Sequence, residues 1–202
     1  MSKNSATKRK LPSPARRRHA RPIESDDFPI LEQLFGANGA CGGCWCMYWR
    51  VPSTGNYWAA HKGVKNKHAF RRLIETSEAH GAIAFEGDDP IGWCSYGPRD
   101  SFAYLKRSRL LPEPTIEGVW SITCFFIARR ARMQGVSSLL LQTACTDVRQ
   151  RGARYLEGYP SSAVGGVAAA AFVHTGLPGP FLKSGFSPVA VSGARTVMRK
   201  RL

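Results

Sequence analysis

A turn that contains an arginine and a glycine, Arg132-Met133-Gln134-Gly135-Val136-Ser137, combines residue types that can bind an anion. The residues before it, 118–127, are rich in β-branched and aromatic side chains that alternate in character, which predicts a strand. The residues after it, 136–152, carry apolar side chains at spacings of three and four, which predicts a helix that ends at Gly152.

A glycine-bearing turn that leads into a helix offers a binding surface for negative charge. The first helical turn leaves backbone N–H groups unpaired, and the helix dipole favours an anion there. Gly135 lets a ligand approach the backbone, and Arg129, Arg130 and Arg132 add positive charge. The pattern therefore predicts a phosphate or pyrophosphate site. The alternative is an ordinary strand-to-helix connection with solvated arginines.

Three segments of the sequence carry a resemblance to a known family. The spacing Arg132-x-x-Gly135-x-Ser137 resembles the pyrophosphate loop of the GNAT N-acetyltransferases, Arg/Gln-x-x-Gly-x-Gly/Ala, with serine as the last small residue. Residues 181–186, FLKSGF, resemble the short helix and Gly-Phe pair near the end of that fold. Residues 41–50 resemble a bacterial subgroup of the family with a Cys-Trp-Cys-Met segment, and the whole resemblance covers roughly residues 24–202.

The resemblance implies a fold, a donor and its contacts. It implies one α/β domain over residues 23–202, with a mixed sheet of six or seven strands, splayed central strands and flanking helices. The implied donor is acetyl-CoA, whose acetyl group passes directly to a primary amine of a small molecule or a protein. The residues that would hold coenzyme A are Phe125, Phe126, Ile127, Arg132, Gln134, Gly135, Val136, Ser137 and Ser138.

The catalytic residues cannot be carried over from the family in the same way. Phe181 stands where many GNAT enzymes have a tyrosine, and Ser121 stands where the histone-acetyltransferase branch has a glutamate. The splayed central strands leave a gap between them, and Glu157 and Tyr159 are on the strand expected beside that gap. They are therefore the candidates for acid–base chemistry. The alternative is that Glu157 pairs with an arginine such as Arg154, while Tyr159 packs in the core.

Three of the six cysteines, Cys41, Cys44 and Cys46, lie close together in sequence. A structural zinc site takes four ligands, and the next histidines are distant along the chain, so we expect no metal here, with zinc as the alternative. The interleaved aromatic residues predict a buried or pocket-lining segment with reduced thiols. On the predicted central strand, Cys124 is expected to be a small core residue rather than a nucleophile.

The hydrophobic pattern predicts further elements around this centre. Ser25-Asp26-Asp27 is expected to cap the first helix. Helices are predicted at 24–35, 66–77, 100–109, 168–174 and 180–184, and strands at 82–85, 91–96, 154–159 and 195–199.

Residues 1–22 differ in composition from the rest of the chain. They carry eight Lys/Arg and no acidic residue, with few large apolar side chains, so we expect a disordered basic tail. A nucleic-acid-binding arm or a localisation signal is the alternative. The net charge of +15 minus these eight cations leaves +7 for residues 23–202, which suits a polyanionic partner such as coenzyme A.

The overall composition, 43% hydrophobic with no apolar run of membrane-spanning length and no signal peptide, predicts a cytoplasmic protein without membrane contact. Three functions remain open at this point. They are an acetyl-CoA-dependent N-acetyltransferase, a non-catalytic acyl-CoA-binding module of the GNAT fold, and a nucleic-acid-associated protein that acts through its tail. The sequence does not specify the acceptor amine or the oligomeric state.

Overall fold

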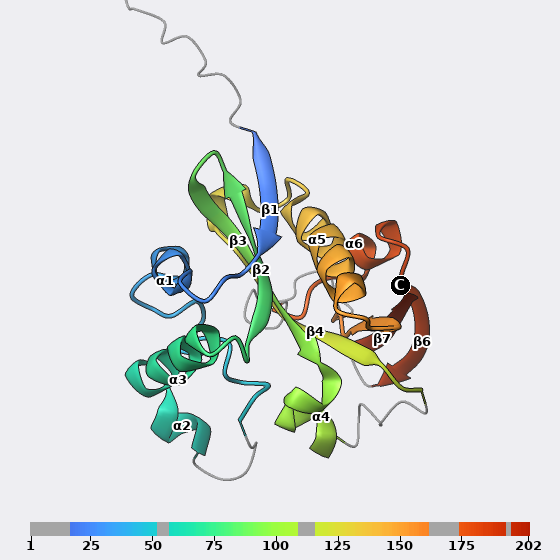
Figure 1. The fold of residues 1–202 in the computed structure, drawn as a ribbon, viewed down its shortest axis with the longest axis horizontal. Coiled ribbons are helices and arrows are strands. Elements are labelled where there is room, and N and C mark those ends of the chain that lie inside the picture. Colours follow the sequence, from blue (N-terminus) through green and yellow to red (C-terminus); the bar gives the residue numbers. More distant parts are fainter. Residues whose placement is uncertain (1–16, 52–56, 109–115, 162–173, 193–194) are drawn as a thin grey trace, which may run out of the picture.

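A seven-stranded mixed sheet forms the centre of the computed structural model, which describes residues 17–51, 57–108, 116–161, 174–192 and 195–202 (Figure 1). The strand order is β1-β2-β3-β4-β5-β7-β6. The strands β4 and β5 are parallel, and the other neighbouring strands are antiparallel. The strands are β1 (Arg18–Pro22), β2 (His80–Glu86), β3 (Asp89–Pro98), β4 (Val119–Ile127), β5 (Tyr155–Gly158), β6 (Ser187–Ser192) and β7 (Arg195–Arg201).

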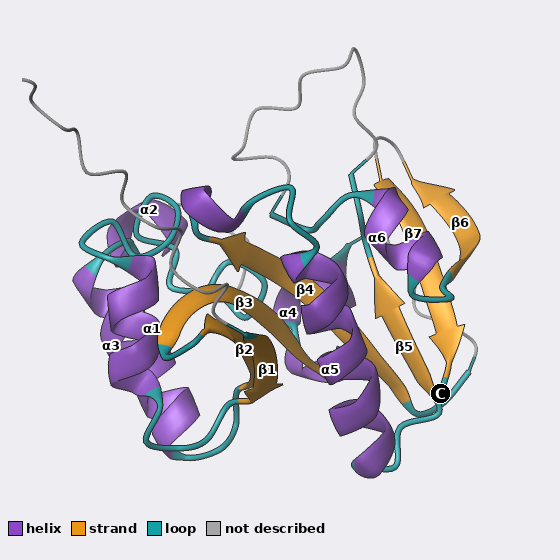
Figure 2. Ribbon diagram, turned by 90° about the horizontal axis from the view of Figure 1, so that it is seen from above, coloured by secondary structure: helices purple, strands orange, loops and turns teal. Residues whose placement is uncertain are grey.

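Helices cover both faces of this sheet (Figure 2). One core lies between the sheet and α5, with α6 beside it, and a second core lies between the sheet and α1 and α3. None of the helices in the described ranges has the length and apolar character that crossing a bilayer requires. The helices are α1 (Phe28–Phe35), α2 (Tyr57–His61), α3 (Val64–Glu75), α4 (Ala103–Arg107), α5 (Val136–Gln150) and α6 (Pro178–Lys183), with short 3₁₀ turns at η1 (Arg99–Ser101) and η2 (Arg129–Ala131).

The two parallel strands separate part-way along their length, as Figure 2 shows. Their pairing ends at Ile122 opposite Gly158, whereas β4 continues to Ile127. The register between β3 and β4 shifts at the same place and leaves Thr123 as an extra, bulged residue. A bulge bends its strand and increases the local twist, which turns the rest of β4 away from β5. The predicted α/β sheet of six or seven strands with splayed central strands is therefore confirmed.

Residues 18–22 correct the predicted extent of the disordered tail. They form the edge strand β1, in which Arg18 lies opposite Glu86 of β2. An edge strand gains ladder hydrogen bonds from the sheet, and the Arg18 guanidinium also gains an ion pair with the Glu86 carboxylate at 2.7 Å. Composition alone does not reveal such distant partners. Residues 1–16 and most of the helix predicted at 168–174 lie outside the described residues.

The first helix begins later than predicted, at Phe28, and Asp27 does not cap it through its side chain. The Asp27 carboxylate instead accepts hydrogen bonds from the Arg21 guanidinium, at 2.5 and 2.7 Å, and from the Glu24 N–H at 2.7 Å. Although burial acts in the opposite direction, these bonds lower the pKa of Asp27. The acid that was expected to cap a helix therefore joins β1 to the start of α1.

Candidate functional site

The loop that precedes α5 has the geometry of an anion-binding turn. Gly135 occupies the N-cap position with φ of 80°, a left-handed conformation that favours glycine. A Cβ atom placed on Gly135 would meet no atom within 4 Å, so the space in front of the loop is open. Met133 also has a positive φ, of 58°, and its side chain is 98% exposed.

The backbone N–H groups at the start of α5 differ in whether they have an acceptor. The N–H groups of Ser138 and Leu139 donate to the Gly135 carbonyl, at 3.0 and 3.1 Å. For the N–H groups of Gly135, Val136 and Ser137, the hydrogen bonds within the described backbone include no acceptor. The Val136 side chain is buried under the sheet, so only its backbone can meet a ligand. These three N–H groups lie where the sequence predicted an anion-binding surface, and that role stays a prediction.

Strand β1 holds this loop in place through Arg18, a residue that the sequence analysis did not single out. The Arg18 guanidinium donates to the Gln134 carbonyl at 3.1 Å and also to the Gln134 side-chain oxygen. The Gln134 side-chain amide donates in turn to the Arg130 carbonyl at 2.8 Å. Arg18 and Gln134 are 116 residues apart, so sequence spacing carries no signal for this contact.

Phe125 and Ile127, two of the residues that the resemblance implies hold coenzyme A, each have one backbone group that is hydrogen-bonded within the chain. The Phe125 N–H donates to the His174 carbonyl at 2.6 Å, and the Ile127 carbonyl accepts from the Arg132 side chain at 3.1 Å. Buried backbone N–H groups require an acceptor, and the chain that returns towards α6 supplies one at His174. Phe126 lies opposite Trp93 in the β3 register.

Glu157 and Tyr159 come together at the end of β5 and form a buried polar cluster. The Tyr159 hydroxyl shares a hydrogen bond of 2.8 Å with Ser121 and donates to Glu157 Oε2 at 3.2 Å. Glu157 Oε1 accepts from the Arg199 guanidinium at 2.7 Å, and Arg99 Nε lies 3.9 Å from Oε2. One carboxylate thus faces two guanidinium groups.

Burial determines what this cluster can do. Glu157 is 2% exposed and Tyr159 is 1% exposed. Burial and the neighbouring Glu157 charge raise the pKa of Tyr159 well above its ordinary range, so its hydroxyl stays protonated. The ion pair considered from the sequence involved Arg154, but the structure places Arg199 opposite Glu157 on β7. A neutral Tyr159 can pass a proton along the cluster, whereas direct contact between Glu157 and an acceptor would require the cluster to open.

Aromatic side chains from residues 41–50, the cysteine-rich segment, border this cluster. The Trp49 ring stacks on Tyr159 with a centroid separation of 6.1 Å and meets the Tyr104 edge at 4.7 Å. Tyr48 lies 5.3 Å from Tyr104, and the Arg195 guanidinium lies 5.1 Å from the Trp49 centroid. Since Tyr48 and Tyr104 are partly exposed, they connect the buried cluster to the surface. The predicted buried or pocket-lining role of the segment agrees with this placement.

Phe181 fills the space between the separated strands. It is 1% exposed, and its ring meets the Phe125 ring edge-on at 6.0 Å. A Cβ atom placed on Gly158 would lie 2.2 Å from the Phe181 ring, so only glycine fits there. An apolar ring at this position cannot donate a proton.

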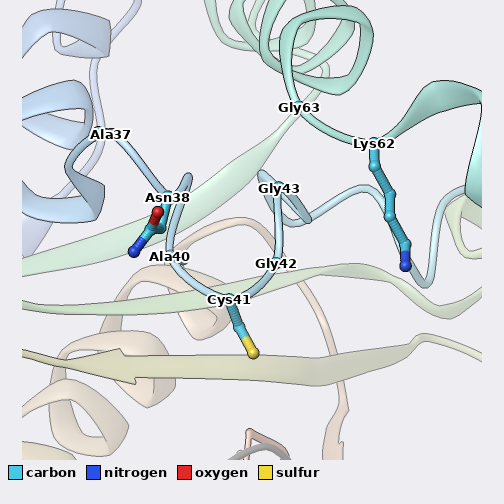
Figure 3. Close-up of a pocket in the computed structure, with 8 residues that line it drawn as sticks. All are labelled: Ala37, Asn38, Ala40, Cys41, Gly42, Gly43, Lys62 and Gly63. Atoms are coloured by element: carbon cyan, nitrogen blue, oxygen red, sulfur yellow. The ribbon is translucent and has the colours of Figure 1, made fainter.

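The three thiols of the cysteine-rich segment differ in exposure. Cys41 is exposed beside a shallow hollow that Lys62 also lines, as Figure 3 shows, whereas Cys46 is 4% exposed and points into the core. Cys44 has intermediate exposure. Among the described residues, no group of three or more His, Cys, Asp or Glu side chains is arranged to hold a metal ion. That this segment holds no metal stays a prediction.

Comparison with known proteins identifies the family. Residues 47–165, more than half of the chain, match the family model described as the acetyltransferase (GNAT) family. The chain belongs to the GNAT family. The match does not bear on the subgroup with a Cys-Trp-Cys-Met segment. No curated protein matches this GNAT chain in sequence.

Solved structures share the fold of this GNAT protein at low sequence identity. The PaiA N-acetyltransferase from Thermoplasma acidophilum, solved with coenzyme A, has a TM-score of 0.54 at 14% identity, over 92% of this chain and 99% of that one. The protein yncA from Salmonella typhimurium, solved with acetyl-CoA, has a TM-score of 0.53 at 12% identity, over 91% and 93%. The ribosomal-protein-alanine N-acetyltransferase from Brucella melitensis has a TM-score of 0.53 at 16% identity, over 91% and 99%.

Proposed function

We propose that this GNAT protein transfers the acetyl group of acetyl-CoA to a primary amine of a small molecule or a protein. The observation that carries the proposal is the set of N–H groups at Gly135, Val136 and Ser137, which have no acceptor within the described backbone and follow the end of β4 that is not paired with β5. Two proteins that share the fold were solved with coenzyme A or acetyl-CoA, which supports the same donor here.

The donor is proposed to bind with its pyrophosphate on the loop. The N–H groups from Gln134 to Ser138 would receive the pyrophosphate oxygens, with Arg132 beside them. The pantetheine arm would follow β4 past Ile127, Phe126 and Phe125 into the gap. At Phe125 it would compete with the His174 carbonyl for the backbone N–H.

The acid–base chemistry is proposed to pass through the buried cluster. An attacking amine must lose a proton, and the thiolate that leaves must gain one. The Oε2 atom of Glu157 accepts from the Tyr159 hydroxyl and has Arg99 Nε at 3.9 Å, whereas Oε1 is bonded to Arg199, so Oε2 is the oxygen proposed to exchange a proton. Tyr159 and Ser121 would therefore relay protons between the gap and Glu157.

A second candidate function is non-catalytic binding of an acyl-CoA. Phe181 lacks a proton donor, and Glu157 is already paired with Arg199, which are the two observations that favour this role. Binding of nucleic acid by residues 1–16 is a separate hypothesis. Deleting these residues and measuring salt-dependent DNA or RNA binding tests it.

The deciding experiment measures donor binding and turnover together. The full-length protein would be incubated with acetyl-CoA and a panel of primary amines, and the acetylated products and free coenzyme A would be quantified by mass spectrometry. Turnover supports the transferase, whereas binding without any product supports the acyl-CoA-binding module. Absence of binding would overturn both.

A matched pair of glycine variants locates the donor site. Gly135 and Gly152 lie at opposite ends of α5 with φ of 80° and 81°, and a Cβ atom on either would meet nothing within 4 Å. Gly135→Glu and Gly152→Glu therefore introduce the same strain and the same charge. We expect Gly135→Glu to abolish measurable coenzyme A binding by bulk and like charge, and Gly152→Glu to retain it. Equal affinities in the two variants would show that the pyrophosphate lies elsewhere.

A further inference from the structure

A row of aromatic rings connects the protein surface to the buried side chain of Tyr159. The Trp49 ring is 1% exposed and stacks on the Tyr159 ring, with 6.1 Å between the centroids. Tyr48 meets Trp49 edge-on at 5.8 Å, and Tyr104 lies 4.7 Å from Trp49 and 5.3 Å from Tyr48. Because Tyr48 and Tyr104 keep partial exposure, the row offers apolar ring surface next to the proposed proton relay.

Arg195 brings a positive charge to these rings. It is the first residue of β7, its side chain is half-buried, and its guanidinium carbon lies 5.1 Å from the Trp49 centroid. Arg199, on the same strand, is paired with Glu157 at 2.6 Å. Within the described parts of the chain, Arg195 has no acidic partner at ion-pair distance. A guanidinium group can bind a carboxylate with two parallel hydrogen bonds, so Arg195 is suited to an incoming carboxylate.

Two further groups in this part of the molecule lack an acceptor. The Trp49 indole N–H is buried and has no hydrogen-bond partner. Nε and Nη2 of Arg50 are also buried without a partner, and the Arg50 guanidinium carbon lies 4.8 Å from the centroid of Phe102, which packs in one core with Trp49 and Tyr159. Buried donors without an acceptor are rare in folded proteins and call for a specific explanation. Around these rings, hydrogen-bond donors and positive charge therefore exceed acceptors and negative charge.

The acid at the end of β5 does not balance this excess. Glu157 already faces two guanidinium groups, those of Arg199 and Arg99, at 2.6 and 3.9 Å. An acceptor that carries only positive charge, such as a polyamine, would meet further positive charge beside the rings. An acceptor with a carboxylate would supply the missing negative charge. The electrostatics therefore favour an acceptor that is both an amine and a carboxylate.

We propose that Arg195 and the aromatic rings of Tyr48, Trp49 and Tyr104 form the acceptor site, and that the acceptor is an amino acid with a flat apolar side chain. The carboxylate binds Arg195, and the side chain packs against Tyr48 and Tyr104. This inference rests on the proposed acetyl transfer and names the acceptor class for it.

The arrangement keeps the reacting amine near the proton relay. The amine of an α-amino acid is one carbon away from its carboxylate, so a carboxylate on Arg195 holds the amine beside the Trp49 ring that stacks on Tyr159. The amine nitrogen attacks the thioester carbonyl carbon, a C–N bond forms, and the C–S bond breaks. The amine loses one proton, the coenzyme A thiolate takes up one, and the products are the N-acetyl amino acid and coenzyme A.

A pair of acceptors that differ only in the carboxylate tests this assignment in the parent protein. Phenylalanine and phenethylamine share the ring and the primary amine, and phenethylamine lacks the carboxylate. We expect kcat/KM for phenylalanine to be about tenfold higher or more, the size of one charge-assisted contact. Equal or higher kcat/KM for phenethylamine would overturn the proposal.

Replacing Arg195 identifies the group that reads the carboxylate. Arg195→Gln should lower kcat/KM for phenylalanine about tenfold, mainly through KM, and leave phenethylamine within about twofold of the parent value. Comparing both substrates in both proteins cancels any difference in amine basicity and any general loss of folded enzyme. Arg201→Gln, which removes an exposed arginine at the other end of β7, is the matched control and should change neither value. A decrease in Arg195→Gln that is equal for the two substrates would overturn the role of Arg195.

A binding measurement separates failure of this inference from failure of the proposed transfer. Calorimetric titration of the full-length protein with phenylalanine, with and without coenzyme A, needs no turnover. Binding of phenylalanine that Arg195→Gln weakens, without any acetylated product, would support the site and overturn the transfer. Acetylation of phenethylamine without binding of phenylalanine would support the transfer and overturn the site. Alanine should bind about tenfold more weakly than phenylalanine, because it lacks the ring, and equal binding would overturn the role of the aromatic side chains.

Discussion

The two ends of β4 differ in their surroundings. The loop around Gly135, which follows one end, has backbone N–H groups without an acceptor in the described backbone. The other end of β4 adjoins the buried side-chain charges of Glu157, Arg99 and Arg199. The loop depends on the conformation of one short stretch of chain. The cluster depends on β4, β5, β7 and η1 being assembled correctly. The first region can therefore change its ligand contacts without disturbing the fold, whereas the second cannot lose a charge without disturbing its neighbours.

The largest expected effect is a loss of stability when the buried carboxylate is neutralised. Glu157→Gln removes the carboxylate charge that faces Arg99 and Arg199, and we expect the free energy of unfolding to fall by about 3 kcal/mol or more. Chemical denaturation of the parent and the variant measures this change. Glu75→Gln, which breaks the exposed pair with Arg71, is the control and should change stability little. Equal losses in the two variants would remove the contrast between the buried cluster and the surface.

The next effect concerns the proposed proton relay. Tyr159→Phe keeps the ring under Trp49 but removes the hydroxyl, so kcat should fall about 10²-fold while the affinity for acetyl-CoA stays nearly unchanged. Steady-state kinetics on the best amine of the panel, with the donor Kd from calorimetry, give both values. Tyr155→Phe, at the start of β5, is the matched control. A parent-like kcat across the pH range in Tyr159→Phe would leave the cluster with a structural role only.

The ion pair of Arg21 and Asp27 tests whether burial alone explains the difference between the Glu157 cluster and the loop around Gly135. Asp27→Asn should lower the free energy of unfolding by about 1–2 kcal/mol at neutral pH, because it weakens the bond from Arg21. The folded-state pKa of Asp27 is lowered, so this stabilisation is present above about pH 4 and is lost as the pH falls through the lowered value. Thermal melts of both proteins should converge in acid. The exposed Asp26→Asn serves as the control, and a difference that persists in acid would exclude the ion pair as its source.

The smallest expected effect is a change in coenzyme A affinity at the loop around Gly135. Arg18→Ala removes the bonds to Gln134 and should weaken coenzyme A binding about five- to tenfold, with kcat unchanged. Arg17→Ala removes an equal charge from the neighbouring position and is the control. Calorimetric titration with coenzyme A compares the variants. If both lose affinity equally, Arg18 acts through charge and not by positioning the loop.

Local patterns allowed much of this protein to be predicted from its sequence. The hairpin of β2 and β3, the strand β4 and the helix α5 each follow from side-chain periodicity, because that periodicity reflects which face is buried. The glycine turn at the start of α5 was predictable for a related reason. The anion binding proposed for it would use the backbone of consecutive residues around Gly135, so sequence neighbours are also spatial neighbours.

Contacts between distant segments were decided only by the tertiary structure. The partner of Glu157 is Arg199 and not Arg154, because β7 inserts beside β5 in the sheet. The same kind of assembly decides three further contacts. They are the pairing of β1 with β2, the hydrogen bond from Arg18 to the Gln134 carbonyl, and the hydrogen bond from the Phe125 N–H to the His174 carbonyl. Each joins residues that are tens of positions apart, and single-sequence patterns carry information on which residues are buried but not on which ones meet.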